Sequence, residues 1–300
     1  MQAAFSPLLA GADDAHGTAL AGFIAAHPRL FVLTGAGCST ASGIPDYRDR
    51  DGNWKRRQPV TLQAFLGDRV TRSRYWARSL VGWRRFGHAQ PSGSHIALAA
   101  LDSAGAVGSL LTQNVDGLHQ AAGSRNVIDL HGRLDQIRCL DCGQRQPREE
   151  FQRVLEDRNA EWCELDALDA PDGDADLEGL DFGRFDVPAC ATCCGILKPD
   201  VVFFGENVPR ERVERAEQSL TDSDGMLVVG SSLMVYSGYR FVRAAARAGK
   251  PVAAVNLGRT RADDLFSLKI EGDCATVLQA ALALLNDRPR NSTPASENAH

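Results

Sequence analysis

The chain has 300 residues, of which 44% are hydrophobic and 24% are charged, so it can form one domain with an insertion or two domains. Its net charge of -5 excludes the overall basic surface that is typical of nucleic-acid-binding proteins. No apolar stretch approaches the roughly 18 residues that a membrane-spanning helix requires, so no membrane association is expected.

The amino-terminal region and the cysteines predict a cytoplasmic protein. No charged-then-apolar signal region is present. The first 20 residues contain Asp13 and Asp14 and no Arg, which argues against an organelle transit peptide. Two Cys-x-x-Cys pairs among the 8 cysteines are more typical of metal thiolates in a reducing compartment than of disulfides.

Strand candidates alternate with helical patterns, which predicts an α/β fold with a Rossmann-like, mostly parallel sheet. Residues 1–16 are expected to be flexible, and a helix is expected over about 17–27. The further elements predicted in chain order are strands at Leu30–Leu33, Val107–Thr112, Val127–Leu130 and Met226–Val229, a helix at Tyr239–Ala248, and strands at Val252–Val255 and about Ser267–Ile270.

Two stretches interrupt this alternation and predict a smaller inserted, zinc-binding domain. Residues 46–95 combine a polar loop with an aromatic-rich helical region, and residues 133–198 contain both cysteine pairs. Within the second stretch, Asp166 to Asp186 is rich in Asp and Gly and is expected to be an exposed loop. The remaining predicted divisions are the larger domain at 17–45, 96–132 and 199–285, and a flexible tail at 286–300.

The first strand runs into Gly35-Ala36-Gly37-Cys38-Ser39, which is expected to open a helix. Glycines there let the backbone approach a pyrophosphate, and a helix N-terminus offers N–H donors to it. A tight turn without a ligand is the alternative interpretation. Thr40 stands where the dinucleotide fingerprint has its third glycine, and a polar loop around Asp51 stands where an acidic ribose ligand is expected. The usual hydride-transfer site is therefore not predicted.

Several predicted strands end in polar or Gly-rich motifs. In open α/β sheets the ligand binds beyond the carboxyl ends of the strands, so these motifs are expected to line one crevice. They are Thr34-Gly35, Gln113-Asn114, His131-Gly132, Gly230-Ser231-Ser232 and Asn256. A neutral imidazole accepts a proton near pH 7, which makes His131, beside Asn114 and Asp116, the candidate general base.

Cys139, Cys142, Cys190 and Cys193 form the two Cys-x-x-Cys pairs and predict a closed, structural zinc site. Two reduced pairs without metal are the alternative. Cys194 directly follows Cys193 and is a competing ligand, although the Cys-x-x-Cys spacing favours Cys193. Cys163, in the acidic stretch, is expected to take no part.

Together and in this order, these motifs resemble the sirtuins, which are NAD-dependent protein lysine deacylases, over about residues 20–285. The resemblance implies that nicotinamide leaves the C1′ carbon of NAD and that the acyl-lysine oxygen attacks this carbon. His131 then deprotonates a ribose hydroxyl, and the products are free lysine, nicotinamide and O-acyl-ADP-ribose. NAD is thus a consumed cosubstrate, one zinc is structural, and acyl-lysine proteins or peptides are the partners. A monomer is expected.

The resemblance also assigns residues. Asn114 and Asp116 would orient ribose, water or nicotinamide, Gln113 would hold a ribose hydroxyl, and Asp46 and Arg48 would position the cofactor. The full set of implied NAD contacts is Gly35, Ala36, Gly37, Ser39, Asp46, Tyr47, Arg48, Gln113, Asn114, Val115, Asp116, Gly230, Ser231, Ser232, Asn256, Leu257, Gly258 and Cys274. Cys38 is an alternative nucleophile by residue type, but no base lies close in sequence and the family commonly has Ile there.

Residues 197–206 match the family segment that pairs with the substrate backbone, so an extended peptide is expected to add between this segment and residues 233–238. Val201 and Phe203 would wall an acyl tunnel; an ordinary buried strand and turn is the alternative. Residues 74–78 and 237–241 resemble class II sirtuins.

Tyr75 and Arg78 have the spacing by which another sirtuin class recognises acidic acyl chains, because one helical turn places them on the same face. The alternative for Arg78 is a solvated side chain on an amphipathic helix. Three other functions remain open: protein ADP-ribosyl transfer from the same site, a non-catalytic NAD sensor, and a nucleic-acid-binding zinc module. The intact His131, Asn114 and Asp116 argue against the sensor, and the acidic stretch argues against the nucleic-acid module.

Overall fold

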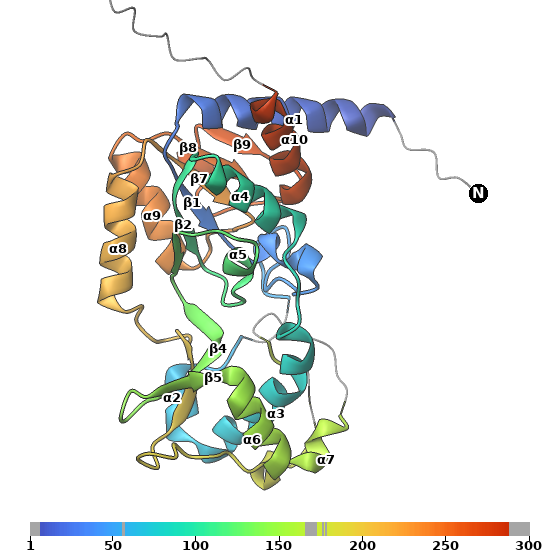
Figure 1. Cartoon of the computed structure of the whole chain (residues 1–300), viewed down its shortest axis with the longest axis vertical. Helices are drawn as coiled ribbons and strands as arrows, with labels where there is room; N and C mark the ends of the chain where they lie inside the picture. Colours follow the sequence, from blue (N-terminus) through green and yellow to red (C-terminus); the bar gives the residue numbers. More distant parts are fainter. Residues whose placement is uncertain (1–6, 56–57, 166–172, 176, 178, 288–300) are drawn as a thin grey trace, which may run out of the picture.

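Two sheets, one in each lobe of the molecule, organise the fold (Figure 1). The computed structural model describes residues 7–55, 58–165, 173–175, 177 and 179–287. The larger lobe contains a sheet of six strands in which all neighbours are parallel, as predicted. Side by side, these strands are β3 Val127–Asp129, β2 Val107–Thr112, β1 Leu30–Thr34, β7 Gly225–Val229, β8 Val252–Val255 and β9 Leu268–Ile270.

The chain order of the strands reverses between β1 and β7. The chain runs outward from β1 through β2 to β3, and it returns to the other side of β1 to continue through β7, β8 and β9. Such a reversal leaves a crevice beyond the carboxyl ends of the two central strands, where ligands of open α/β sheets bind. The topology therefore places the candidate site between the turns that follow β1 and β7.

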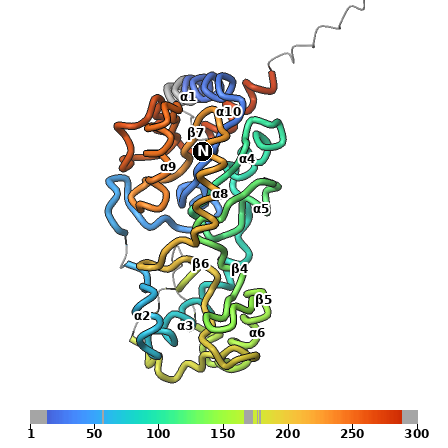
Figure 2. The backbone as a smooth tube through the Cα atoms, turned by 90° about the vertical axis from the view of Figure 1, so that its left-hand side faces the viewer, coloured from blue at the N-terminus to red at the C-terminus, as the bar shows by residue number. Residues whose placement is uncertain are grey.

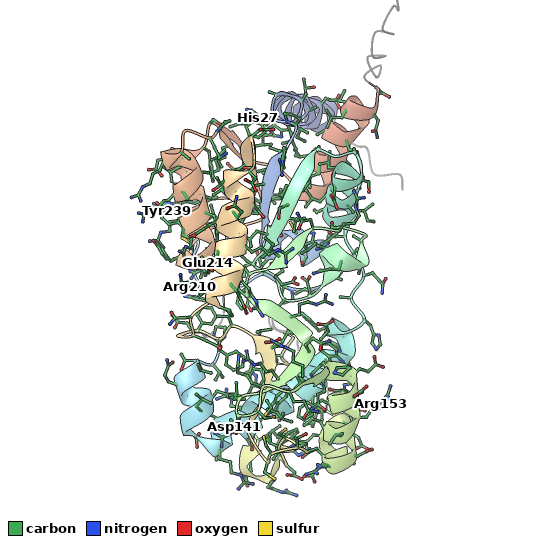
Figure 3. All side chains as sticks on the ribbon, turned by 60° about the vertical axis from the view of Figure 1, so that its left-hand side comes forward. His27, Asp141, Arg153, Arg210, Glu214 and Tyr239 are labelled. Atoms are coloured by element: carbon green, nitrogen blue, oxygen red, sulfur yellow. The ribbon has the colours of Figure 1, made fainter. Side chains whose placement is uncertain are left out.

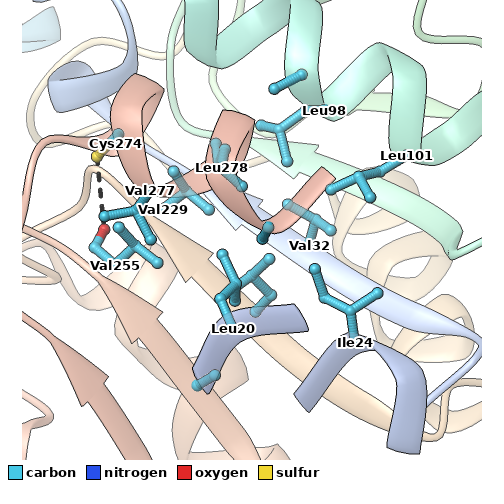
Figure 4. Close-up of a cluster of buried hydrophobic side chains, with 14 of the residues drawn as sticks. Leu20, Ile24, Val32, Leu98, Leu101, Val229, Val255, Cys274, Val277 and Leu278 are labelled. Carbon is cyan, nitrogen blue, oxygen red and sulfur yellow. Dashed lines mark hydrogen bonds between the residues drawn. The ribbon is translucent and has the colours of Figure 1, made fainter. Parts of the chain in front are cut away.

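Helices cover both faces of this sheet. On β1, Leu30 and Val32 pack with side chains of α1, α4 and α10 (Figure 4). Phe31 and Leu33 pack with side chains of α8 and α9. Successive side chains of a strand point to opposite faces, and because both faces are covered the strands are continuously apolar. The helices are α1 Pro7–Ala26, α4 Gly93–Ser103, α8 Arg210–Thr221, α9 Tyr236–Arg247 and α10 Cys274–Asn286.

Helix α1 begins at Pro7, so the prediction of a flexible segment up to residue 16 is wrong for residues 7–16. The apolar periodicity that sets the predicted start at Gly17 corresponds to the part of α1 that contacts α10. At Gly17 this contact is close, because an added Cβ would lie 2.6 Å from Cβ of Ala280. The helical backbone continues beyond that contact, away from the sheet (Figure 1). Residues 1–6 and 288–300, which include most of the predicted flexible tail, lie outside the described residues.

The smaller lobe combines helices with a three-stranded antiparallel sheet of order β5-β4-β6 (Figure 2). Its own apolar core includes the fully buried side chains of Trp76, Phe151 and Phe185. Gly132, the first residue of β4, has φ 83°, and an added Cβ would lie 2.0 Å from the carbonyl oxygen of Asp200, so only glycine fits there. The elements are α2 Leu62–Gly67, α3 Arg69–Phe86, β4 Gly132–Cys139, β5 Arg145–Pro147, α6 Arg148–Arg158, α7 Ala160–Cys163 and β6 Leu197–Val201.

The prediction that Asp166 to Asp186 forms an exposed loop is wrong for half of its described residues, which are buried. Four apolar side chains in it are at most 8% exposed and belong to the core of the smaller lobe: Ala175, Leu177, Phe182 and Phe185. The backbone N–H of Ala175 also donates to the carbonyl of Arg78 on α3, at 3.1 Å. The many Asp and Gly residues around these positions conceal their apolar spacing in the sequence. Residues 166–172, 176 and 178 lie outside the described part of the chain.

The remaining regular elements are short and lie in the connections. They are α5 Leu118–Ala121 and the 3₁₀ helices η1 Ala36–Cys38, η2 Thr40–Ser42, η3 Phe182–Arg184 and η4 Asp263–Leu265. No helix in the described part of the chain has both the length and the apolar character needed to cross a membrane.

Candidate active site and metal centre

A cavity of about 460 Å³ lies at the carboxyl ends of the central strands. Its lining includes His131 and every implied NAD contact except Gly258. Gly258 instead packs on Arg50, because an added Cβ would lie 2.4 Å from the Arg50 carbonyl oxygen. The predicted crevice thus brings together residues from both halves of the sheet. Of the four predicted substrate residues, Val201, Phe203 and Tyr75 line the cavity and Arg78 does not.

The Gly35-Ala36-Gly37 turn opens a helix, as predicted. The helical part consists of the two short 3₁₀ helices η1 and η2, and Gly43 (φ 84°) closes the second of them. The N–H of Gly37 donates to the carbonyl of Gly230 at 2.8 Å, and an added Cβ on Gly37 would lie 2.8 Å from Cα of Gly230. The glycines therefore join the turns after β1 and β7 as well as leaving backbone exposed to the cavity.

Three side chains form a hydrogen-bonded network across the carboxyl ends of β1 and β2. The hydroxyl of Ser39 donates to the Asp116 carboxylate at 2.7 Å, and the Asn114 amide donates to Ser39 Oγ at 2.9 Å and to the Gly35 carbonyl at 3.1 Å. The Leu118 backbone N–H donates to the other Asp116 oxygen at 2.9 Å. These bonds fix Asn114 and Asp116 in place before any ligand arrives.

Gln113 links the same region to β7. Its side-chain amide donates to Ser231 Oγ at 2.6 Å, and its backbone carbonyl contacts the imidazole of His131. A side chain on Gly238 would clash with this amide, because an added Cβ would lie 2.4 Å from Gln113 Oε1. Gln113 therefore connects the two halves of the sheet through its side chain and its backbone carbonyl.

Both ring nitrogens of His131 have partners. Nδ1 lies 2.8 Å from the carbonyl oxygen of Gln113, which only accepts, so Nδ1 carries the proton. Nε2, which then has a free lone pair, lies 2.8 Å from Oγ of Ser237. Burial lowers the pKa of His131 below its usual range, although the bond to Gln113 raises it. The ring is thus a neutral base near pH 7, with Nε2 as its basic atom.

The loop that holds Asp46, Tyr47 and Arg48 is fixed by its own contacts. Arg48 donates to the carbonyl of Gly52 at 2.7 Å, and its guanidinium lies 4.0 Å from the ring centre of Trp54. Asp46 accepts a hydrogen bond from Lys55. Burial lowers the pKa of Arg48, but an arginine remains charged near pH 7. The loop therefore presents a fixed positive charge to the cavity.

An apolar recess extends the cavity into the smaller lobe. Tyr75 and Phe203 line it with ring centres 5.2 Å apart, and Phe65 packs edge-on against both. Arg78 is 3.4 Å from Asp174, a carboxylate in the segment that was predicted to be exposed. The helix periodicity shows that Tyr75 and Arg78 share a face, but it does not reveal that a carboxylate from the distant segment pairs with Arg78.

Lys198 and Glu206 form an ion pair of 3.0 Å within the segment expected to bind the peptide. Glu206 also accepts from the backbone N–H of Phe203 at 2.9 Å, and Lys198 donates to the carbonyl of Val201. Burial lowers the pKa of Lys198, and the Glu206 carboxylate raises it. Sequence reasoning missed this pair, because Asp200 is closer to Lys198 in the sequence than Glu206 is.

The four predicted zinc ligands converge. Their sulfur atoms all lie within 4.8 Å of one another, and the closest pairs are Cys139 with Cys193 at 3.5 Å and Cys142 with Cys190 at 3.8 Å. Zinc–sulfur bonds of about 2.3 Å in a tetrahedron require sulfurs about 3.8 Å apart, so the cluster fits zinc. Backbone N–H groups of Cys142 and Asp141 lower the pKa of Cys139, which favours the thiolate that binds metal.

The other cysteines do not join the cluster. Cys194 is exposed, has φ 60°, and donates its N–H to the carbonyl of Cys190 at 2.8 Å. Cys163 lies against the carbonyl of Asn159. Cys38 is fully buried, does not line the cavity, and has a pKa raised by burial, so it is a poor nucleophile.

Fold and site together define a Rossmann-like nucleotide-binding protein with a four-thiolate metal module. The model of the Sir2 family matches residues 35–237. A protein of Xanthomonas campestris pv. campestris named "NAD-dependent protein deacetylase" is 66% identical over 273 residues, 91% of this chain and 92% of that protein. The "NAD-dependent protein deacetylase 2" of Bradyrhizobium diazoefficiens is 67% identical over 263 residues, 88% of this chain and 95% of that protein.

Solved structures agree with these relatives. The structure described as "Sir2-p53 peptide-NAD+" has a TM-score of 0.72 and 29% identity, over 89% of this chain and 97% of that one. Another, "Structural Basis for the Mechanism and Regulation of Sir2 Enzymes", has a TM-score of 0.72 and 31% identity, over 91% and 98%. The chain belongs to the Sir2 family, the sirtuins.

Proposed function

We propose that this protein is an NAD-dependent protein lysine deacylase that transfers the acyl group from lysine to ADP-ribose. One observation carries the proposal: the basic nitrogen of His131 is held where the strand-end turns of the nucleotide site meet the apolar recess. Relatives named as NAD-dependent protein deacetylases, at 66% identity over 91% of the chain, support it.

The residues of the larger lobe fit NAD. Gly35, Gly37 and Gly230 offer backbone along the cavity, and Arg48 offers a positive charge to the phosphates. Bound NAD supplies a nicotinamide leaving group and a ribose carbon that accepts the acyl oxygen. Asn114 and Asp116, already held by Ser39, orient the ribose and water at this end of the cavity.

His131 is the general base of the proposed reaction. Nε2 accepts a proton from the ribose hydroxyl, and the Gln113 carbonyl then stabilises the imidazolium through Nδ1–H. The hydroxyl of Ser237 contacts Nε2 of His131 at the position that the ribose hydroxyl has to take, so it must move away when the ribose binds. The lowered pKa keeps the ring unprotonated before this step.

The substrate is proposed to bind as an extended strand between residues 197–206 and 233–238, with its acyl chain in the recess of Tyr75, Val201 and Phe203. This apolar lining favours acetyl and other apolar acyl chains. Acceptance of succinyl-type chains by Arg78 remains a separate prediction, because Asp174 already pairs with this guanidinium. The Arg78→Met variant tests it: an unchanged ratio of acidic-acyl to acetyl rates would reject a role for Arg78.

The proposal includes a structural role for zinc, held by Cys139, Cys142, Cys190 and Cys193. It also includes membership of class II, a cytoplasmic location, a monomeric state and the predicted division into two domains. Protein ADP-ribosylation from the same cavity is the competing activity, and an NAD sensor without turnover is the competing non-enzymatic function.

The test is NAD-dependent removal of acyl groups from a panel of acyl-lysine peptides, followed by mass spectrometry, with His131→Ala as the control. Formation of O-acyl-ADP-ribose by the wild type and its loss in the variant is the expected result. Biotinylated NAD that instead labels protein covalently would favour ADP-ribosylation. Binding of NAD by the zinc-loaded protein without turnover of any peptide would favour the sensor.

A further inference from the structure

Two tyrosines and two arginines form a cluster next to the mouth of the cavity, here called the tyrosine–arginine patch: Tyr236, Tyr239, Arg243 and Arg261. Tyr236 and Arg261 are exposed, and Tyr239 and Arg243 are half-buried. The guanidinium of Arg261 lies 4.5 Å from the ring centre of Tyr239 and 5.9 Å from that of Tyr236. The guanidinium of Arg243 lies 6.0 Å from each ring. Figure 3 shows Tyr239 on α9 at the outer side of the larger lobe.

The patch is continuous with the cavity. Val235, Tyr236 and Ser237 line the cavity, and Tyr236 is 52% exposed, so its ring lies between the cavity and solvent. Arg261 is bonded to the same loop, because its backbone N–H donates to Ser232 at 2.9 Å and its side chain donates to the Met234 carbonyl at 3.3 Å. A peptide in the cavity therefore leaves it past these side chains.

The positive charges of the patch are available. Among the described residues, neither Arg243 nor Arg261 lies within 4.0 Å of a carboxylate, whereas Arg240 on the same helix pairs with Glu217 at 3.1 Å. Asp263, in the η4 segment that packs on α9, is engaged by Lys269 and Thr260. Asp264, next to Asp263, is exposed, and so is Arg247 on α9. The local charge balance around the patch therefore remains positive.

The spacing of the patch matches a peptide. Tyr236, Tyr239 and Arg243 are three and four positions apart, so they lie along one face of α9. At 1.5 Å of rise per residue, Arg243 lies about 9 Å along the helix from Ser237, the partner of His131. An extended peptide advances about 3.3 Å per residue, so about three residues cover this distance.

We propose that the tyrosine–arginine patch binds an acidic side chain of the substrate, two to four residues from the acyl-lysine. This inference rests on the proposed deacylase function and specifies its substrate class: proteins with Asp or Glu near the modified lysine. Guanidinium groups stacked on tyrosine bind carboxylates through paired hydrogen bonds, and tyrosine and arginine dominate the energetics of many interfaces.

The experiment compares acetyl-lysine peptides that differ in one residue, Glu, Gln or Lys, placed two to four positions before or after the acetyl-lysine. With saturating NAD, we expect kcat/KM to be about fivefold higher for Glu than for Gln at the best position, the range of one or two exposed ion pairs. The preference should shrink at high salt. A ratio near one at every position would overturn the proposal.

Variants locate the preference. Arg243→Gln/Arg261→Gln should remove the preference for Glu. Because Arg261 also donates to the Met234 carbonyl, the ratio of kcat/KM for the Glu and Gln peptides within this variant is the quantity to measure. Arg247→Gln, a matched change in the exposed last turn of α9, should retain the preference. A preference that survives in the double variant would place the recognition elsewhere and reject the patch.

The outcome also separates this inference from the proposed function. Turnover without a charge preference rejects only the patch. If no peptide is turned over, fluorescence anisotropy of labelled Glu and Gln peptides measures binding directly, with the wild type and the double variant. Tighter binding of the Glu peptide that the double variant loses would support the patch without the deacylase function, and equal binding would reject it.

Discussion

His131 and Ser237 lie 2.8 Å apart, Nε2 to Oγ, although they are 106 positions apart in the chain. The first ends the connection after β3, and the second is in the first turn of α9. The Ser237 hydroxyl contacts Nε2 of His131, the nitrogen that is proposed to take the proton. In the free enzyme it therefore occupies the position of the ribose hydroxyl of the substrate.

This pair leads to a prediction about pH. Burial lowers the pKa of the His131 base below its usual range, so activity should be lost only as the pH falls through that lowered pKa. Ser237→Ala removes a hydroxyl that stabilises the neutral ring, so it should shift the acidic limb of the kcat/KM profile to higher pH. His131→Ala should lower the rate by about 10²- to 10⁴-fold.

A matched control for Ser237→Ala is Ser223→Ala, whose hydroxyl donates to the Leu220 carbonyl just before the amino end of β7, away from the cavity. Its pH profile should coincide with that of the wild type. An acidic limb in Ser237→Ala that coincides as well would show that Ser237 does not act on the base.

A second prediction concerns Lys198 and Glu206, whose side chains are 4% and 27% exposed. Glu206→Gln keeps an acceptor for Phe203 N–H but leaves a buried cation unpaired, so it should cost about 3 kcal/mol of unfolding free energy. Because the pair fixes residues 201–203, the KM for peptide should rise while the KM for NAD stays constant. Steady-state kinetics and urea unfolding measure both effects.

The double variant Lys198→Met/Glu206→Gln provides the control. It removes the unpaired charge, so it should recover part of the lost unfolding free energy. Equal increases in both KM values would contradict a specific role of the pair at the peptide site.

A third prediction concerns the metal. The protein should bind one zinc per chain, and Cys193→Ser should lower both the zinc content and the melting temperature, because structural zinc contributes directly to folding. Cys194→Ser should leave the zinc content unchanged, since Cys194 is outside the sulfur cluster. Elemental analysis and thermal unfolding test this; loss of zinc in Cys194→Ser would make that residue a ligand.

A fourth prediction concerns the backbone of Cys194, whose φ of 60° is in the left-handed region. A side chain costs about 1 kcal/mol there, so Cys194→Gly should raise the free energy of unfolding by up to this amount. Cys194→Ala keeps a Cβ and should give no such gain. Urea unfolding of the zinc-loaded proteins compares the two, and equal stabilities would show that the turn is unstrained.

The sequence was sufficient for the parallel sheet because its strands are continuous apolar runs, each ended by Gly or polar residues. It was equally informative for the cysteine cluster, since the two pairs have their own spacing. It could not reveal contacts between distant segments, such as Arg78 with Asp174 or His131 with Ser237. The burial of Phe182 and Phe185 was hidden for the same reason, because their packing partner is α3 rather than a neighbouring residue.

Strand β4 starts directly after His131 and ends at Cys139, a predicted metal ligand. The five residues of β6 pair with both ends of β4, so at about 3.3 Å per residue these ends are some 13 Å apart. The strand pairs with β6 at both ends, with a register shift between Arg133 and Ile137, and with β5 over Gln136–Arg138, so it connects the base directly to the cysteine cluster. An electrophile or oxidant that removes the metal therefore releases the Cys139 end of β4, the strand that follows His131. Inhibitors of this kind need no resemblance to either substrate.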